Sequence, residues 1–206
     1  MKPEIEAKFL NTNHDALRAK LIEIGATRER PMRLMRRKVF DFPDFRLDKQ
    51  KNAWVRVRDE GDKITMGYKQ LNDRSLEGTH EVSVEVDDFD TACAFLESVG
   101  MEVKAYQETK RESWRLGAVE IELDEWPWIR PFAEIEGPDE ASLRHVAARL
   151  GLDWRDVRHG SVEVAYLAEY DVTEHEIDML AAITFETALP ELLAGKRKKT
   201  QAGSVQ

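Results

Sequence analysis

The sequence is short of several features that define whole classes of proteins. Only one of its 206 residues, Cys93, is a cysteine, which excludes an internal disulfide framework. No run of about 18 apolar residues is present. The first residues, Met-Lys-Pro-Glu-Ile-Glu, lack the basic and apolar regions of a signal peptide. We therefore expect a cytoplasmic protein that makes no contact with a membrane.

Positive charge is outnumbered by negative charge, and the residue patterns of zinc sites do not occur. Lys and Arg number 31 against 40 Asp and Glu, a formal net charge of −9, so no nucleic-acid partner is expected. The histidines are scattered, and neither a His-x-x-x-His pair nor a cysteine pair occurs, so a zinc site is not expected. Cys93 has no histidine in a pairing context, and we interpret it as a small buried side chain rather than a nucleophile.

Charge as such is abundant: Asp, Glu, Lys and Arg make up 34% of the chain, above the roughly 25% of an average domain. Several segments alternate apolar and charged residues with a period of two, which predicts β-strands. About eight such segments occur, at 3–10, 33–42, 54–58, 62–70, 80–86, 102–115, 118–124 and 132–136. Glycine-containing turns between some of them indicate antiparallel hairpins. Helical spacing appears at 13–24, 90–99, 139–150 and 174–194.

The acidic and basic residues of these strands are sorted. Residues 120–124 carry only acids on one face, and residues 56–58 carry only arginines. A solvated sheet face usually mixes both signs and pairs them across strands. One acidic strand alone is better explained as a solvated face, but the whole set favours charged faces that line a shared interior, with helices over the apolar outer faces.

Such an interior would suit phosphate chemistry. Clusters of carboxylates without His or Cys favour Mg²⁺ or Mn²⁺. Arg56, Arg58, Lys69 and the basic run 36–38 offer donors for phosphate oxygens. Bound cations together with fixed positive side chains are what phosphoryl transfer requires, and this chemistry needs no Ser or Cys nucleophile.

The N-terminal segment Glu4-Ile5-Glu6-Ala7-Lys8 resembles the Glu-x-Glu-x-Lys signature of the CYTH superfamily, the triphosphate tunnel metalloenzymes. The companions of that signature follow in family order over about positions 3–167. They are Phe40-Asp41-Phe42-Pro43, Trp54-Val55-Arg56-Val57-Arg58, Lys69, Glu81, Glu85, Lys110-Arg111, Trp114, Glu120-Ile121-Glu122-Leu123-Asp124 and Glu134-Ile135-Glu136.

The resemblance implies an α+β fold: an eight-stranded antiparallel β-barrel that forms a tunnel with a charged interior and helices packed outside. It also implies that Mg²⁺ or Mn²⁺ is bound by Glu4, Glu6, Asp124, Glu134 and Glu136, and that a triphosphate is held by Lys8, Arg56, Arg58, Lys69 and Arg111. To the metal ligands we add Glu81, Glu85 and Glu122, and to the triphosphate ligands Arg36 and Lys38. The residues expected to act in catalysis are Glu4, Glu6 and Lys8.

The expected activity is metal-dependent hydrolysis of a triphosphate, which is inorganic triphosphate, thiamine triphosphate or a nucleotide. Residues 126–132, beginning Trp-Pro-Trp, resemble class IV adenylyl cyclase-like members. The first alternative is therefore a cyclase that makes cyclic AMP and pyrophosphate from ATP. The second is an inactive module that binds polyphosphate or nucleotide. Trp126 and Trp128 would either stack on a substrate ring or, more commonly for such a corner, pack a rim.

Two regions are expected along the chain. Residues 1–170 form the tunnel domain, and residues 171–206 form a helical extension that ends in a basic, disordered tail containing Lys196-Arg197-Lys198-Lys199. The oligomeric state is left open, with a homodimer among the options.

Overall fold

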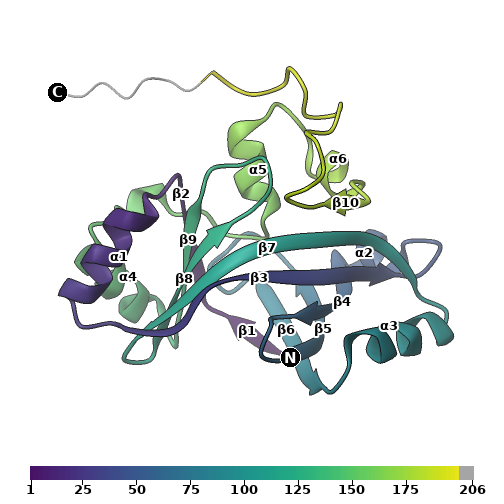
Figure 1. Ribbon diagram of the computed structural model, residues 1–206, viewed down its shortest axis with the longest axis horizontal. Coiled ribbons are helices and arrows are strands. Elements are labelled where there is room, and N and C mark those ends of the chain that lie inside the picture. The colour runs from purple at the N-terminus through teal and green to yellow at the C-terminus, as the bar shows by residue number, and fades with distance from the viewer. Residues whose placement is uncertain (200–206) are drawn as a thin grey trace.

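The computed structural model describes residues 1–199, whose strands form one curved antiparallel sheet (Figure 1). In chain order the strands are β1 (Lys2–Glu4), β2 (Glu6–Leu10), β3 (Thr27–Asp41), β4 (Ala53–Asp59), β5 (Ile64–Leu71), β6 (Thr79–Val86), β7 (Glu102–Leu116), β8 (Val119–Glu125), β9 (Phe132–Glu136) and β10 (Ala182–Ile183). The predicted α+β class and antiparallel pairing are confirmed. The exception to the pairing is the short β10, which lies parallel to β7.

The sheet is a nearly closed barrel, because its two edge strands are consecutive in the chain. The order of neighbours is β1-β6-β5-β4-β3-β7-β8-β9-β2, and only Ile5 separates β1 from β2. The N-terminal segment pairs with β6 through β1 and with β9 through β2. Within residues 1–199 the wall therefore contains nine strands rather than the predicted eight, since segment 3–10 divides at Ile5 to reach both neighbours.

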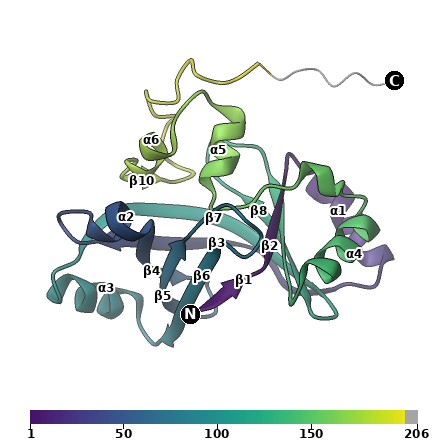
Figure 2. The same ribbon diagram turned by 180° about the vertical axis from the view of Figure 1, so that it is seen from behind.

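Three helices cover the outer surface of the barrel (Figure 2). They are α1 (His14–Glu23), α3 (Phe89–Ser98) and α4 (Glu140–Leu150), close to their predicted spans. The side chain before each helix, Asn13, Asp88 or Asp139, accepts a hydrogen bond from a backbone N–H of the first turn. No helix within the described part of the chain is long and apolar enough to cross a membrane.

The hydrophobic core lies between these helices and the outer face of the barrel. Leu21 of α1 and Leu143 of α4 belong to one buried cluster with Ile121 and Ile135 of the wall. A second cluster joins α3 to β3 and β4 and includes Cys93, which is buried as predicted. Because the apolar faces of the strands are turned outward to the helices, the inward faces are left for charged side chains.

The C-terminal region differs most from the sequence prediction. The pattern over 174–194 predicts one helix, but α6 (Glu174–Asp178) ends early, and β10 follows it and pairs with β7. Pairing with β7 occupies backbone groups that a continuing helix would need, and Pro190 cannot extend a helix. The structure also contains α2 (Arg46–Lys51), α5 (Glu163–Glu169) and the 3-10 helix η1 (Trp154–Asp156), which the sequence pattern did not predict.

The basic run at the end of the chain is partly anchored. Lys196 Nζ lies 3.0 Å from Glu176 Oε1, and Arg197 Nη2 lies 2.6 Å from Glu169 Oε2. These contacts correct the expectation that the whole run is a solvated tail, because buried Glu169 recruits Arg197 as a counter-ion. Residues 200–206 of the expected tail lie outside the described residues.

Candidate active site

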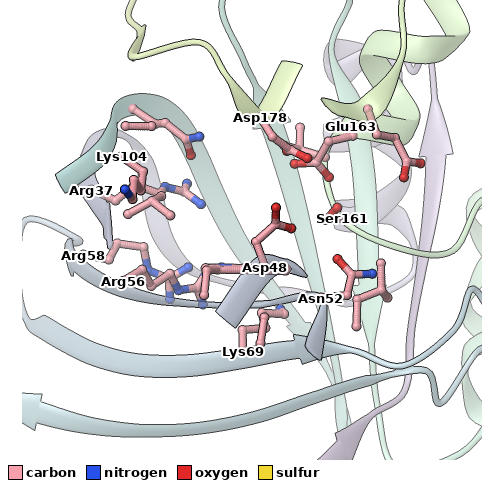
Figure 3. A pocket seen from close by; sticks show the side chains of 18 of the residues that line it. Arg37, Asp48, Asn52, Arg56, Arg58, Lys69, Lys104, Ser161, Glu163 and Asp178 are labelled. Atoms are coloured by element: carbon pink, nitrogen blue, oxygen red, sulfur yellow. The ribbon is translucent and has the colours of Figure 1, made fainter. Parts of the chain in front are cut away.

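The barrel encloses a cavity of about 290 Å³ that is lined by strand residues and by the segment around α5 and α6 (Figure 3). Successive side chains of a strand alternate between its two faces, so charged residues two apart enter the same interior. The cavity brings together most of the residues predicted for the site: Glu4, Glu6, Lys8, Arg56, Arg58, Lys69, Glu81, Arg111, Glu134 and Glu136.

One group of these residues lies where β2 pairs with β9. The register places Glu6 opposite Glu136 and Lys8 opposite Glu134. Lys8 Nζ lies 2.8 Å from Glu6 Oε1 and 3.0 Å from Glu134 Oε2. Burial alone would lower the pKa of Lys8, but Glu134 and Glu6 together raise it above its usual value. Lys8 is therefore a fixed positive charge inside a group of carboxylates.

A second group spans β1, β4, β5 and β6. Lys69 Nζ lies 2.6 Å from Glu4 Oε2 and 3.4 Å from Glu81 Oε2, and Arg56 Nη2 lies 3.1 Å from Glu81 Oε2. Burial opposes ionisation of Glu81, yet Arg56 and Lys69 lower its pKa to about 2. In Glu4 burial dominates, and the pKa rises to about 7 although Lys69 opposes the shift. Neighbouring carboxyls thus differ in how readily they carry charge at neutral pH.

Gly67 of β5 makes room for the contact between Arg56 and Glu81. Arg56 on β4 lies opposite Gly67, and Gly67 lies opposite Ser83 of β6. A Cβ atom at Gly67 would be 3.1 Å from Glu81 Oε1 and 3.2 Å from the Ser83 Cβ. The missing side chain lets two residues from non-adjacent strands meet above β5.

Arg111 and Asp124 form a two-pronged ion pair. Arg111 Nε and Nη2 each donate a 2.7 Å hydrogen bond to the Asp124 carboxylate, which is fully buried. Asp124, one of the predicted metal ligands, does not itself line the cavity. Its carboxylate instead lies behind Arg111 and fixes the orientation of that guanidinium.

The basic run on β3 is divided between the two faces of the wall. Arg36 and Lys38, the predicted triphosphate ligands, lie outside the wall, where each packs over the ring of Phe89 on α3. Arg36 also pairs with Asp59 at 3.0 Å. The side chain between them, Arg37, lies inside and lines the cavity. In a run of three basic residues, alternation does not show which side chains face inward. An error of one residue in the assignment places every side chain of the strand on the wrong face.

Two predicted metal ligands also lie apart from the cavity lining. Glu85 is exposed, four residues beyond Glu81 on the same side of β6, and at about 3.3 Å per residue the strand has by then left the cavity. Glu122 lies beside Arg111 and Ser113, where burial, with Asp124 and Glu134 adding, raises its pKa to about 7.

Several residues that line the cavity were missed by sequence reasoning. Figure 3 shows Arg37 near Arg56 and Arg58, while Glu163 and Asp178 lie toward the opposite side. The others include Lys104, which a bulge in β7 leaves without a partner on β3, and Asp48, Asn52, Ser161, Glu174 and His175 from helices and loops. Lys104 lies at a bulge, and the helix and loop residues lie outside strands, so the period-two signal could not reveal them. Arg37 belongs to the predicted basic run 36–38, but alternation could not show that it is the member that lies inside.

The Trp-Pro-Trp segment divides between two roles. Trp126 lines the cavity and has the Arg37 guanidinium 4.7 Å from the centroid of its ring. Trp128 is outside the lining and donates from Nε1 to the Thr187 carbonyl at 3.1 Å. Trp126 thus supports a cavity arginine, while Trp128 packs on the C-terminal segment.

The donor set of the cavity fits a hard divalent cation. Glu4, Glu6 and Glu136 offer only carboxylate oxygens, the ligands that Mg²⁺ and Mn²⁺ prefer. Burial and repulsion from Glu4, Glu134 and Glu6 raise the pKa of Glu136 to about 7, and a cation would relieve that repulsion. Among residues 1–199 no three His, Cys, Asp or Glu side chains converge as a formed metal cluster. A cation would therefore compete with Lys8 and Lys69 for these oxygens.

Solved structures share this architecture. A protein of Pyrococcus horikoshii is 26% identical, with a TM-score of 0.62 over 75% of this chain and 93% of that chain. A Vibrio parahaemolyticus protein described as a candidate adenylate cyclase is 21% identical, with a TM-score of 0.68 over 81% and 98%. A Hippeastrum protein described as a candidate adenylyl cyclase with a dominant triphosphatase activity is 16% identical, with a TM-score of 0.56 over 80% and 95%.

Among curated proteins, no sequence matches the chain. The CYTH domain model matches residues 2–164, which include the barrel and its charged interior. The chain belongs to the CYTH domain family.

Proposed function

We propose that the protein hydrolyses a triphosphate with the help of a divalent cation, inside the barrel. The observation that carries the proposal is one cavity with guanidinium and ammonium groups on β4, β5 and β7 and carboxylates on β1, β2 and β9. A triphosphate carries about four negative charges, and its hydrolysis needs both kinds of group within reach of the same phosphate chain.

The chain's own residues would bind and orient the substrate. Arg56 and Arg58 are neighbours on one face of β4 and present forked donors, while Lys69 adds a point charge from β5. The Glu81 and Glu4 carboxylates hold Arg56 and Lys69 in place. A bound phosphate chain would thus meet donors that are already oriented, which lowers the entropy lost on binding.

Hydrolysis then requires in-line attack of water on the terminal phosphorus. The new P–O bond forms as the bond to the bridging oxygen breaks, which releases orthophosphate and diphosphate or a nucleoside or thiamine diphosphate. Fixed guanidinium groups stabilise the charge that develops on the phosphoryl oxygens. When bound at Glu4, Glu6 and Glu136, Mg²⁺ or Mn²⁺ would neutralise further negative charge there.

Uncharged residues of the cavity lining favour a substrate with an organic group. Phe45, Trp54 and Met179 supply apolar surface to the lining, and Asn52 supplies an amide. This lining supports thiamine triphosphate or a nucleotide over inorganic triphosphate. It also keeps adenylyl cyclase as the second candidate, since ATP bound in this way could undergo attack by its ribose 3′-hydroxyl on the α-phosphorus with release of pyrophosphate.

One assay separates these activities. Purified protein is incubated with Mg²⁺ or Mn²⁺ and with inorganic triphosphate, thiamine triphosphate or ATP, and orthophosphate, pyrophosphate and cyclic AMP are measured. Orthophosphate release that stops on chelation of the cation supports the triphosphatase. Cyclic AMP with pyrophosphate supports the cyclase, and turnover of no substrate supports a binding module and contradicts the proposal.

A further inference from the structure

Arg37 is a buried arginine of the cavity that has no role in the proposed triphosphate site. Its residue surface is 8% exposed, and it lies on β3 directly opposite Arg58 of β4. Both side chains line the cavity, and Figure 3 shows them close together with Arg56. Two arginines that face each other across neighbouring strands repel one another unless negative charge lies between them.

The contacts of Arg37 hold its guanidinium without neutralising it. Nη2 donates to Thr109 Oγ1 at 3.0 Å, and the guanidinium carbon lies 4.7 Å from the centroid of the Trp126 ring. Within residues 1–199 no carboxylate forms an ion pair with Arg37. By contrast, each of the other basic residues that line the cavity has a carboxylate partner: Lys8, Arg56, Arg58, Lys69, Lys104 and Arg111.

Within the described residues, Arg37 and Arg58 each have a hydrogen-bond donor without a partner, which favours a bound anion. Nε of Arg37 and Nε of Arg58 are both buried, and neither has a hydrogen-bond partner in the part of the chain that the structure describes. Burial, followed by repulsion from Arg56 and Arg58, lowers the pKa of the Arg37 guanidinium. A buried cation and two buried N–H donors without acceptors are each unfavourable, and an anion with several acceptor oxygens would relieve both.

We infer that Arg37 and Arg58 form a clamp that binds one phosphoryl group. Arg37 contributes most to the affinity of the clamp, and Thr109 and Trp126 hold the Arg37 guanidinium in place. The inference rests on the proposed function, because it assigns a place to part of the triphosphate chain. A phosphoryl group has three non-bridging oxygens and accepts hydrogen bonds from two guanidinium forks at once. Since Arg37 has no internal counter-ion, its charge is available without breaking an ion pair.

The first test compares Arg37→Met with a control on the same strand. Arg36→Met is the matched control, because Arg36 lies one residue away and outside the wall. Binding of inorganic triphosphate is measured by titration calorimetry without added metal. We expect Arg37→Met to weaken binding at least about 10-fold, the loss typical of a charge-assisted contact. Arg36→Met should keep the wild-type affinity.

Thermal unfolding separates binding from a structural role. Without ligand, Arg37→Met should unfold at the wild-type Tm or above it, because an unpaired buried charge is removed and an apolar chain of similar length replaces it. The rise in Tm caused by inorganic triphosphate should be smaller than in the wild type. Arg37→Lys, which keeps the charge but loses the fork, should recover part of the affinity.

Three results would overturn the clamp: wild-type affinity in Arg37→Met and Arg37→Lys, a ligand-free Tm that falls in both variants without a change in binding, or a wild-type protein that binds no triphosphate. The proposed hydrolysis fails separately. A wild-type protein that binds triphosphate through Arg37 but releases no orthophosphate supports the clamp and contradicts the activity. Hydrolysis together with wild-type affinity in Arg37→Met supports the activity and contradicts the clamp.

Discussion

Lys69 of β5 reaches past β6 to Glu4 of β1, with 2.6 Å between Lys69 Nζ and Glu4 Oε2. The pair joins a residue proposed to hold phosphate to one proposed to hold a cation. A phosphate bound to Lys69 would therefore free Glu4 for a cation, and a cation bound to Glu4 would free Lys69 for phosphate.

Replacing Lys69 should change the two binding events in opposite directions. In Lys69→Met, Mn²⁺ no longer competes with an ammonium group for Glu4, so Mn²⁺ affinity at pH 8 should rise by a few fold. The affinity for triphosphate should fall by about 10-fold, because one charge-assisted contact is lost. Titrations with Mn²⁺ alone and with inorganic triphosphate alone measure both. Lys20→Met on the exposed face of α1 is the control. A parallel fall in both affinities would contradict the proposed competition between Lys69 and a cation for Glu4.

Glu6→Gln should remove activity without removing the fold. Lys8 keeps its 3.0 Å contact with Glu134, so its charge stays paired. The proposed cation loses one of its carboxylates, and hydrolysis at a fixed Mg²⁺ concentration should fall by about 100-fold or more. Orthophosphate release and circular dichroism check the two claims. The exposed Glu85→Gln on β6 should behave as the wild type, and full activity in Glu6→Gln would refute our assignment of the site.

Arg56 and Glu81 should show strong coupling in a double-mutant cycle. Arg56→Met leaves a largely buried carboxylate with Lys69 as its remaining partner, at a cost of about 2 kcal/mol in the free energy of unfolding. Adding Glu81→Met removes that carboxylate and should restore part of the stability but none of the triphosphate affinity. Urea unfolding measures the stability, and calorimetry the triphosphate affinity, of the wild type, both single variants and the double variant. Additive losses of stability would show that the two side chains do not act as a pair.

The stability of the metal-free protein should fall as pH rises from about 4.5 to about 7. Glu4 and Glu136 have folded-state pKa values of about 7, against 4.5 in their ordinary state. In that window the unfolded chain has released protons that the folded chain still holds, so rising pH favours unfolding. The raised pKa of Glu136 accounts for a loss of the order of 3 kcal/mol in the free energy of unfolding across this window.

Urea unfolding at several pH values in the presence of a chelator measures this slope, and Glu136→Gln should make it shallower. The pKa of Glu81 is lowered to about 2, so Glu81 affects stability in a different pH range. Its ionised carboxylate stabilises the folded protein, and that stabilisation is lost only as pH falls from about 4.5 toward 2. Added Mg²⁺ should restore stability at pH 8. A slope that is unchanged in Glu136→Gln would mean that this carboxyl does not hold its proton in the folded protein.

Much of the wall could be predicted from alternation alone. In β2, β4 and β9 one charged and one apolar residue follow each other, so Glu6, Arg56 and Glu134 could be assigned to the interior face. The run at residues 36–38 offered no such contrast. Only the register of β3 with β4, which places Arg37 opposite Arg58, shows which of three basic side chains lies inside.

The sequence by itself determined the family, the antiparallel strands and the sorting of acids from bases, because a period of two and short ordered motifs are local properties of the chain. The tertiary structure decided which of those charges meet. Closure at Ile5, the room above Gly67, the burial of Asp124 behind Arg111 and the approach of α5 and α6 to the cavity all depend on contacts between residues far apart in the chain. Pairing and desolvation, which set the charge of each carboxyl, exist only once those contacts form.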